Sequence, residues 1–146
     1  MQSRKRNRLE GYDYGQPGVY FVTICVKDRR KLLGSIVGAD AHIGPQIELS
    51  DLGRIADAYL QSMDGVEKYC VMPNHIHLLL RSDGDGPPIP QRIRSFKILV
   101  SKACGTTLFQ RSYYDHIIRG ERDYREIWQY IENNPLKWQL DEFYVD

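Results

Sequence analysis

The segment VEKYCVMPNHIHLLLRS (residues 66–82) predicts a β-hairpin. Pro73 and Asn74 are turn-forming residues, and the chain on either side of them is rich in apolar and β-branched side chains. We therefore expect two antiparallel strands over residues 66–72 and 75–82, with the second strand inside a sheet because of its nearly continuous apolar character.

Two histidines lie in the apolar half of this hairpin. Side chains alternate along a strand, so His75 and His77 point to one face while Ile76 and Leu78 point into the core. Two imidazoles on one face can bind one metal ion, although water-facing or carbonyl-bonded histidines are an equally simple explanation of so short a motif. A histidine-triad nucleotide hydrolase is excluded, because its third histidine would fall at Leu79. Metal-assisted phosphoryl chemistry remains possible.

The surrounding elements predict an α+β fold with the order β-α-β-β-α-β, the ferredoxin-like arrangement. We expect an antiparallel sheet with helices on one face, the other face free for a ligand, and an additional C-terminal helix. Ser50 is the expected N-cap of the first helix, and Pro90 suits the first turn of the second. The predicted strands outside the hairpin cover residues 19–27, 32–37 and 111–118, and residues 38–49 are expected to form a loop with a short extended end.

The last helix supplies two further candidate groups. We expect it to begin at Asp123, in a capping box with Glu126, and to end before Pro135, which disfavours helical geometry at Asn134. Tyr130 lies on the flank of the helix, and Asn134, four residues later, lies on the same side. The apolar stripe consists of Tyr124, Ile127, Trp128 and Ile131.

Together these groups suggest a reaction on a phosphodiester. Neutral imidazoles and an amide leave the charge of a divalent metal undiminished, so it can stabilise the charge that develops on phosphorus oxygens. Tyr130 could then attack phosphorus and form a phosphotyrosine without ATP, and no Gly-x-x-x-x-Gly-Lys loop is present. The base for the phenol is open between a metal-bound water and Lys137. Taken singly, Tyr130 and Asn134 are better explained as an interfacial tyrosine and a helix-end cap, and only their combination with His75 and His77 favours the functional interpretation.

Composition limits the class of protein. The 146 residues fit one domain, with residues 1–15 as a basic N-terminal arm, and no run of about 18 apolar residues predicts a membrane span. No signal peptide is visible, so we expect a cytoplasmic protein. The three cysteines form no Cys-x-x-Cys pair. The net charge of +1 is uninformative, but the arm combines tyrosines with basic residues suited either to DNA contact or to a solvated tail: Arg4, Lys5, Arg6 and Arg8.

Five segments together resemble the REP-associated tyrosine transposases, relatives of the single-tyrosine HUH transposases of bacterial insertion sequences. They are RKRNRLEGYDY, YFVTICVKDRR, VMPNHIHLLL, SFK and YYDHIIRGERDYREIWQYIENNPLKW, and they cover roughly residues 4 to 140. The resemblance implies cleavage and rejoining of single-stranded DNA beside hairpins, with Mg²⁺ or Mn²⁺.

By motif match, the resemblance makes His75 and His77 the metal-binding pair, Tyr130 the nucleophile that gives a 5′-phosphotyrosine and a free 3′-OH, and Asn134 the third ligand. Insertion-sequence relatives usually have glutamine at this last position. Arg94, Lys97 and Arg111 join the N-terminal arm as expected DNA contacts. Tyr113 and Tyr114 are competing nucleophiles, and the lone His116 is expected to be structural.

Two other functions remain open at this stage. A non-catalytic hairpin-DNA-binding protein would keep the basic residues but lack ligands or nucleophile, whereas all four site residues are present here. A hydrolytic metal phosphoesterase would form no covalent adduct. The sequence leaves open whether the protein is a monomer or a homodimer, and therefore whether Tyr130 meets the histidines of its own chain.

Overall fold

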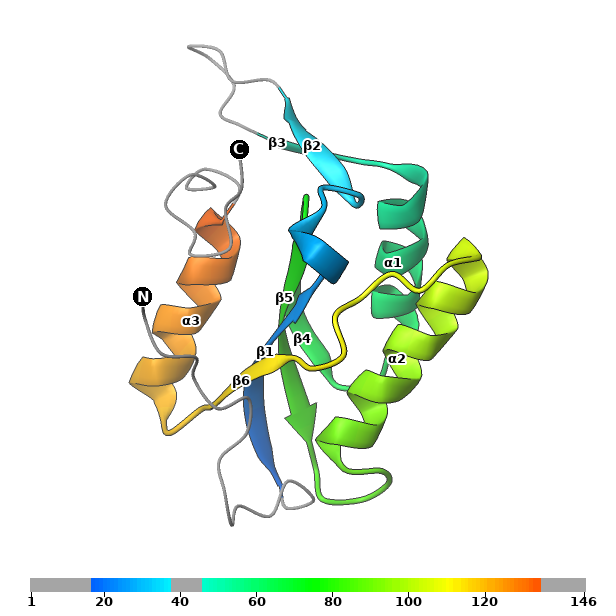
Figure 1. Ribbon diagram of the computed structural model, residues 1–146. Helices are drawn as coiled ribbons and strands as arrows, with labels where there is room; N and C mark the ends of the chain where they lie inside the picture. The colour runs from blue at the N-terminus through cyan, green and yellow to red at the C-terminus, as the bar shows by residue number, and fades with distance from the viewer. Residues whose placement is uncertain (1–16, 38–45, 135–146) are drawn as a thin grey trace, which may run out of the picture.

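The computed structural model describes residues 17–37 and 46–134 (Figure 1). Its main sheet contains four antiparallel strands in the order β4-β5-β1-β6, with bounds β1 Gly18–Cys25, β4 Val66–Met72, β5 His75–Ser82 and β6 Tyr114–Ile117. Helix α1 (Asp51–Ser62) joins β1 to β4, and α2 (Ile89–Cys104) joins β5 to β6. This connection and strand order confirm the predicted α+β, ferredoxin-like fold.

The hairpin of β4 and β5 forms as predicted, with only Pro73 and Asn74 between its strands. Met72 pairs with His75 next to the turn. The turn is also tied to the chain that follows β1, because the amide of Val26 donates to the Asn74 carbonyl over 2.9 Å. The histidine-bearing end of β5 is therefore fixed from two neighbouring strands.

Helices cover both faces of the sheet (Figure 1). On one face α1 and α2 enclose the larger core, which includes Ile76, Leu78 and Leu80 of β5. On the other face lies α3 (Glu121–Asn133), whose Ile131 packs with Val19 and Leu79. The expectation that this second face would be free for a ligand is therefore wrong, because the apolar stripe of α3 is buried against it.

Two further strands form a small second sheet. Within the described part of the chain, β2 (Gly34–Val37) and β3 (Gln46–Leu49) pair with each other and with no strand of the main sheet. The predicted strand at 32–37 is thus shorter than expected, and the extended end of the predicted loop becomes β3. Ser50 caps α1 as predicted, accepting a hydrogen bond from the Gly53 amide over 3.1 Å.

Helix α3 ends before Pro135 as predicted, but its start and the backbone geometry of Asn134 differ from the prediction. The helix begins at Glu121 after Gly120, so Asp123 is not its N-cap. Instead the Asp123 carboxylate lies in the first turn and accepts the Arg119 amide over 3.0 Å, the backward reach expected of the acidic member of a capping box. Asn134 keeps helical angles, φ −58° and ψ −43°, although a proline follows it.

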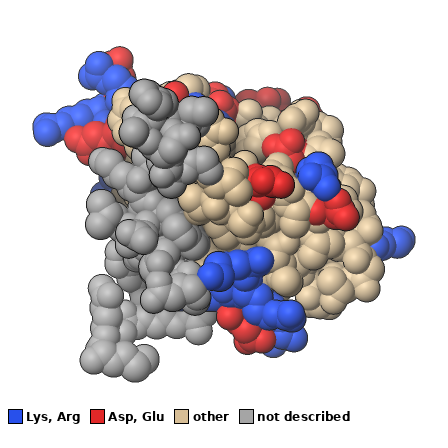
Figure 2. Space-filling view, turned by 90° about the horizontal axis from the view of Figure 1, so that it is seen from above, with Lys and Arg blue, Asp and Glu red and all other residues tan. Residues whose placement is uncertain are grey.

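Charges of both signs are mixed over the surface seen in Figure 2, where Lys and Arg side chains alternate with Asp and Glu over a large uncharged area. This agrees with the small net charge of the chain. The described residues in this view form no extended positively charged surface that would attract a polyanion. No helix in the described part of the chain is long and apolar enough to cross a membrane.

Candidate metal and nucleophile site

The two histidines of β5 point to the same face, as predicted, and their rings meet. His75 and His77 are fully buried, with 0% and 1% of their surface exposed. Their Nε2 atoms lie 3.0 Å apart, and the ring planes are inclined by 73°. The alternation of β5 puts both rings under α3, away from the larger core.

The outer nitrogen of each ring contacts a fixed oxygen. His75 Nδ1 lies 2.7 Å from Asn74 Oδ1, and His77 Nδ1 lies 2.8 Å from Thr23 Oγ1 on β1. An amide oxygen only accepts hydrogen bonds, so His75 Nδ1 is the donor and its Nε2 carries the lone pair when the ring is neutral. A threonine hydroxyl can donate or accept, so it suits either tautomer of His77.

The sequence prediction did not include Asn74 and Thr23 as site residues. Asn74 was identified only as a turn residue, although it directly precedes the first histidine. Thr23 faces His77 because β1 and β5 pair in the register that sets these two residues opposite each other. That register is a tertiary property, so no pattern within either strand could have indicated it.

Tyr130 approaches the histidines from α3. Its ring centroid lies 5.3 Å from that of His77 and 6.0 Å from that of Phe21, which contacts His77 in turn. The side chain is 38% exposed, so it lies at the rim and not in the packed interface. The structure thus brings the predicted nucleophile next to the predicted metal-binding pair within one chain.

Asn134 is buried to 1% exposure at the C-cap of α3. Its Oδ1 atom is a buried acceptor that has no hydrogen-bond partner within the described part of the chain. An amide oxygen buried without a donor costs about 1–3 kcal/mol, so such an atom calls for an explanation such as a ligand. Because Asn134 stays helical, this oxygen lies on the same side of α3 as Tyr130.

The spacing of the two imidazole nitrogens fits an octahedral divalent ion, although imidazole is a softer ligand than the oxygens that Mg²⁺ prefers. Two nitrogens 3.0 Å apart match adjacent positions of an octahedral shell with bonds of about 2.1 Å. The described residues contain no group of three or more His, Cys, Asp or Glu side chains suited to a metal. A third protein ligand from the described residues would therefore be an amide oxygen, and that of Asn134 is unpaired.

Several contacts fix α3 over this site. Tyr124 donates its hydroxyl to Glu67 over 2.7 Å, and Lys68 binds Glu132 over 3.1 Å. His116 on β6 lies 2.8 Å from Asp123 of α3, and its structural role stays a prediction. Burial would raise the pKa of the Asp123 carboxyl, but hydrogen bonds from the Arg119 amide and His116 outweigh it and lower that pKa.

The competing tyrosines lie elsewhere. Tyr113 is buried at 4% exposure in the core on the α2 side of the sheet, away from the histidines. Tyr114 pairs with Thr23 in the β1–β6 ladder, so it is on the same face as His77 but one strand further away. Among these three tyrosines, Tyr130 is the one whose ring contacts that of His77 in the described part of the structure.

The predicted DNA contacts fall into two groups. Arg4, Lys5, Arg6 and Arg8 lie outside the described residues, as does Lys137. Arg94, Lys97 and Arg111 come together around a groove beside α2, on the opposite side of the sheet from the histidines. Their DNA role stays a prediction.

Comparison with known proteins gives consistent relatives, although no protein-family model matches the chain. It is 32% identical to an uncharacterized protein of Haemophilus influenzae, over all of this chain and 96% of that protein. A second Haemophilus influenzae protein, named as a candidate REP-associated tyrosine transposase, is 26% identical over 92% of this chain and 84% of its own length. The REP-associated tyrosine transposase of Escherichia coli is 30% identical over 56% of this chain and 55% of its own.

A solved structure has the same fold. A REP-associated tyrosine transposase bound to a REP hairpin superposes with a TM-score of 0.63 at 23% identity, over 97% of this chain and 77% of the other. The protein therefore has the fold of that transposase. Two of its sequence relatives carry the name of the REP-associated tyrosine transposases, so the chain is similar to members of that family.

Proposed function

We propose that the protein is a metal-dependent single-stranded DNA endonuclease and strand transferase that acts at hairpin, REP-like DNA. Tyr130 is the proposed nucleophile, and His75, His77 and Asn134 are the proposed ligands of Mg²⁺ or Mn²⁺. The observation that carries the proposal is the approach of Tyr130 to the histidine pair, whose Nε2 atoms lie 3.0 Å apart, with the Tyr130 ring 5.3 Å from that of His77. The unpaired buried oxygen of Asn134, on the same side of α3 as Tyr130, supports it.

The bound metal ion would supply charge that polarises the phosphodiester and stabilises the extra negative charge of the transition state. Asn74 and Thr23 would orient the two imidazoles through their Nδ1 atoms. Burial of both histidines keeps water from competing for their Nε2 atoms. The arrangement on β5, held by β1 and β4, gives the ligands a rigid base.

The chemical step is a transesterification. The Tyr130 oxygen attacks phosphorus and loses its proton, the bond from phosphorus to the 3′ oxygen breaks, and that oxygen takes up a proton as a free 3′-OH. The products are a 5′-phosphotyrosine on the protein and a 3′-OH end on the DNA. In the reverse direction a 3′-OH attacks the phosphotyrosine and releases Tyr130, so the phosphodiester is rebuilt without ATP.

The hairpin substrate is inferred from the relatives. The solved relative is described as bound to a REP hairpin, and two sequence relatives are named for REP association. The exposed position of Tyr130 at the rim of the site, with 38% of its surface accessible, is compatible with attack on a long substrate that does not enter a closed cavity.

A denaturing gel tests the proposal. Wild-type protein mixed with labelled single-stranded hairpin DNA and Mn²⁺ should give a covalent adduct that survives denaturation, and Tyr130→Phe should give none while still binding DNA. Tyr114→Phe is the matched control, and it should form the adduct normally. An adduct that persists in Tyr130→Phe and disappears in Tyr114→Phe would reassign the nucleophile.

The same gel separates the alternatives. Cleavage into free products with no adduct would identify a hydrolytic phosphoesterase, and hairpin binding with neither cleavage nor adduct would identify a non-catalytic binding protein. Loss of metal-dependent cleavage in both His75→Ala and His77→Ala is expected, and undiminished cleavage by both would remove their metal role.

A further inference from the structure

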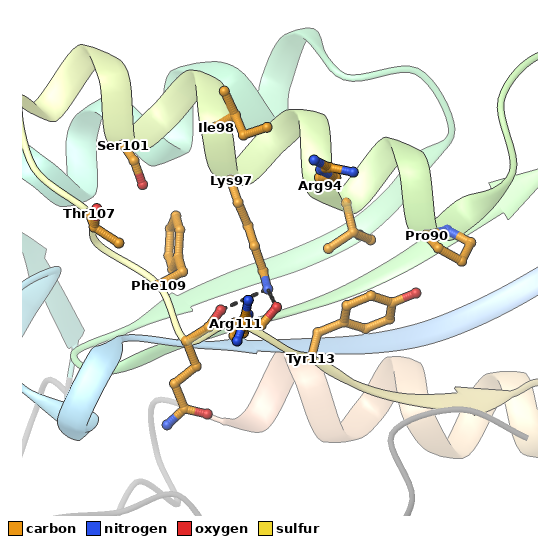
Figure 3. A pocket seen from close by; sticks show the side chains of 11 residues that line it. Pro90, Arg94, Lys97, Ile98, Ser101, Thr107, Phe109, Arg111 and Tyr113 are labelled. Atoms are coloured by element: carbon orange, nitrogen blue, oxygen red, sulfur yellow. Dashed lines mark hydrogen bonds between the residues drawn. The ribbon is translucent and has the colours of Figure 1, made fainter.

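A groove of about 750 Å³ lies on the α2 side of the sheet, between α2 and the chain of residues 107–113 that leads into β6 (Figure 3). One wall carries Arg94 and Lys97 from α2, and the other carries Arg111 and Tyr113. The histidines and Tyr130 lie across the sheet on the α3 side. The groove is thus separate from the site described above.

Lys97 holds the two walls together. Its ammonium group donates to the carbonyl oxygens of Gln110, Arg111 and Ser112 over 2.8, 3.1 and 2.9 Å. An ammonium has three N–H donors, so these three bonds use all of them. Lys97 therefore fixes the backbone that holds Arg111 opposite Arg94. Because its donors are already used, we assign Lys97 a structural role and not a role in binding a ligand.

Arg94 and Arg111 are different. Both are exposed, and neither guanidinium has a hydrogen bond or ion pair with the described residues, whereas Arg54, Arg81 and Arg122 all form ion pairs. Among the described residues no Asp or Glu lines the groove, in contrast to the mixed charges of Figure 2. Two unpaired guanidiniums in a groove without acids fit phosphate groups.

The lower part of the groove is apolar and aromatic. Ile93, Phe109 and Tyr113 are buried to 1%, 5% and 4% exposure and line it. These three side chains form the closed floor of the groove, and the exposed apolar side chain of its lining is that of Ile98, 54% exposed. Ile98 can contact the apolar face of a base, which is accessible only when the nucleotide is unpaired. The groove volume lies in the range typical for small-molecule sites, which suits one or two nucleotides.

We propose that this groove binds unpaired nucleotides of the DNA, with phosphates on Arg94 and Arg111 and a base against the exposed side chain of Ile98. The inference rests on DNA being the substrate, as proposed above, and adds a second contact region across the sheet from Tyr130. A DNA strand held there would anchor the substrate while another part of it reaches the histidines.

The test is binding of a labelled oligothymidylate, measured by fluorescence anisotropy over a series of salt concentrations without metal. Arg94→Ala/Arg111→Ala should bind about tenfold more weakly, and the slope of log affinity against log salt should fall by about 1.4, since each single-strand phosphate contact contributes roughly 0.7. Arg54→Ala, which removes an exposed arginine from α1, is the matched control and should leave both quantities unchanged. Thermal unfolding checks that each variant is folded.

Two further probes test the nucleotide assignment. Wild type should bind a strand of abasic sites more weakly than oligothymidylate. The double substitution should reduce the affinity for a blunt duplex less than it reduces the affinity for a single strand. Equal binding of abasic and normal strands, or equal losses on duplex and single strand, would overturn the assignment to unpaired nucleotides.

The adduct gel keeps the two proposals distinguishable. If the adduct forms on Tyr130 while the double variant binds oligothymidylate like wild type, the groove proposal fails and the proposed function stands. If no adduct forms but the double variant still loses affinity and salt slope, the groove proposal stands and the proposed reaction fails.

Discussion

Replacing Thr23 by valine tests whether the site is built for a metal ion. The two side chains have nearly the same shape and both suit the interior of β1, so the change removes little more than the oxygen that lies 2.8 Å from His77 Nδ1. Thr23 is 3% exposed, so water has little access to replace that oxygen. The expected effect can be followed through the proton positions of the two histidines.

In the metal-free protein the hydroxyl acts as a donor. His75 Nδ1 donates to Asn74, so the Nε2 of a neutral His75 is an acceptor. His77 Nε2 is 3.0 Å away and must therefore carry the proton of that contact, which leaves His77 Nδ1 to accept from Thr23. Loss of this hydrogen bond should lower the free energy of unfolding by about 1 kcal/mol.

Binding of the proposed metal ion would reverse the role of the Thr23 hydroxyl. Both Nε2 lone pairs would have to face the ion, so His77 would carry its proton at Nδ1 and Thr23 would accept from it. Valine can take neither role, and the loss of such an orienting partner typically weakens metal affinity 10–100-fold, about 1.4–2.8 kcal/mol. Isothermal titration with Mn²⁺ measures the affinity, and urea unfolding without metal measures the stability.

Thr23→Ser is the matched control, because it keeps the hydroxyl and should bind Mn²⁺ within a few-fold of wild type. Long-range ¹H–¹⁵N NMR spectra of metal-free wild type should show His75 protonated at Nδ1 and His77 at Nε2. Mn²⁺ affinity of Thr23→Val within twofold of wild type, in a folded protein, would refute the orienting role of Thr23.

Three further changes have expected outcomes that follow from the same structure. Asn134→Leu removes an unpaired buried oxygen, so urea unfolding without metal should show a gain of about 1 kcal/mol while titration shows weaker Mn²⁺ binding; a loss of stability would mean that the oxygen has a partner. Lys97→Met leaves three backbone carbonyl oxygens without their hydrogen-bond donor, so urea unfolding should show a loss of about 1–3 kcal/mol in the free energy of unfolding. An unchanged free energy of unfolding would contradict the structural role of Lys97. The hydrogen bond from Arg81 holds the pKa of the Glu67 carboxyl below its ordinary value of 4.5, against burial and with help from Tyr124. A carboxyl whose pKa is lowered by folding stabilises the protein fully above its ordinary pKa, and this stabilisation is lost as pH falls through the lowered pKa. The free energy of unfolding of wild type should therefore exceed that of Glu67→Gln by a constant amount above about pH 5 and by less below about pH 4. A difference independent of pH would exclude this linkage.

Local patterns predicted those parts of the molecule that local physics controls. The hairpin at Pro73 and Asn74, the common face of His75 and His77, and the apolar stripe of α3 all follow from alternation, helical periodicity and turn chemistry. The ferredoxin-like order followed from the sequence of elements, because short connections leave few topologies open.

What the sequence could not predict depends on long-range packing. The pairing of Thr23 with His77 requires the register between β1 and β5. The position of Asn134 requires knowing that packing keeps the residue before Pro135 helical, against the usual preference. The grouping of Arg94 with Arg111 depends on three hydrogen bonds made by Lys97 across 13 to 15 residues of chain.

The way α3 is docked explains how an exposed tyrosine can still be precisely aimed. Exposed ion pairs such as Lys68–Glu132, with side chains 25% and 52% accessible, contribute little to stability. Burial of Ile131 against Val19 and Leu79 supplies most of the attachment, but apolar contacts alone would let a helix rotate or slide. Hydrogen bonds and ion pairs fix that rotation from two strands, from β4 through Glu67 and Lys68 and from β6 through His116. A third strand, β1, contributes the ring contact of Phe21 with Tyr130. Tyr130 is therefore oriented by contacts distributed along the helix, and substitutions at its far end should change the geometry of the site without touching any of its residues.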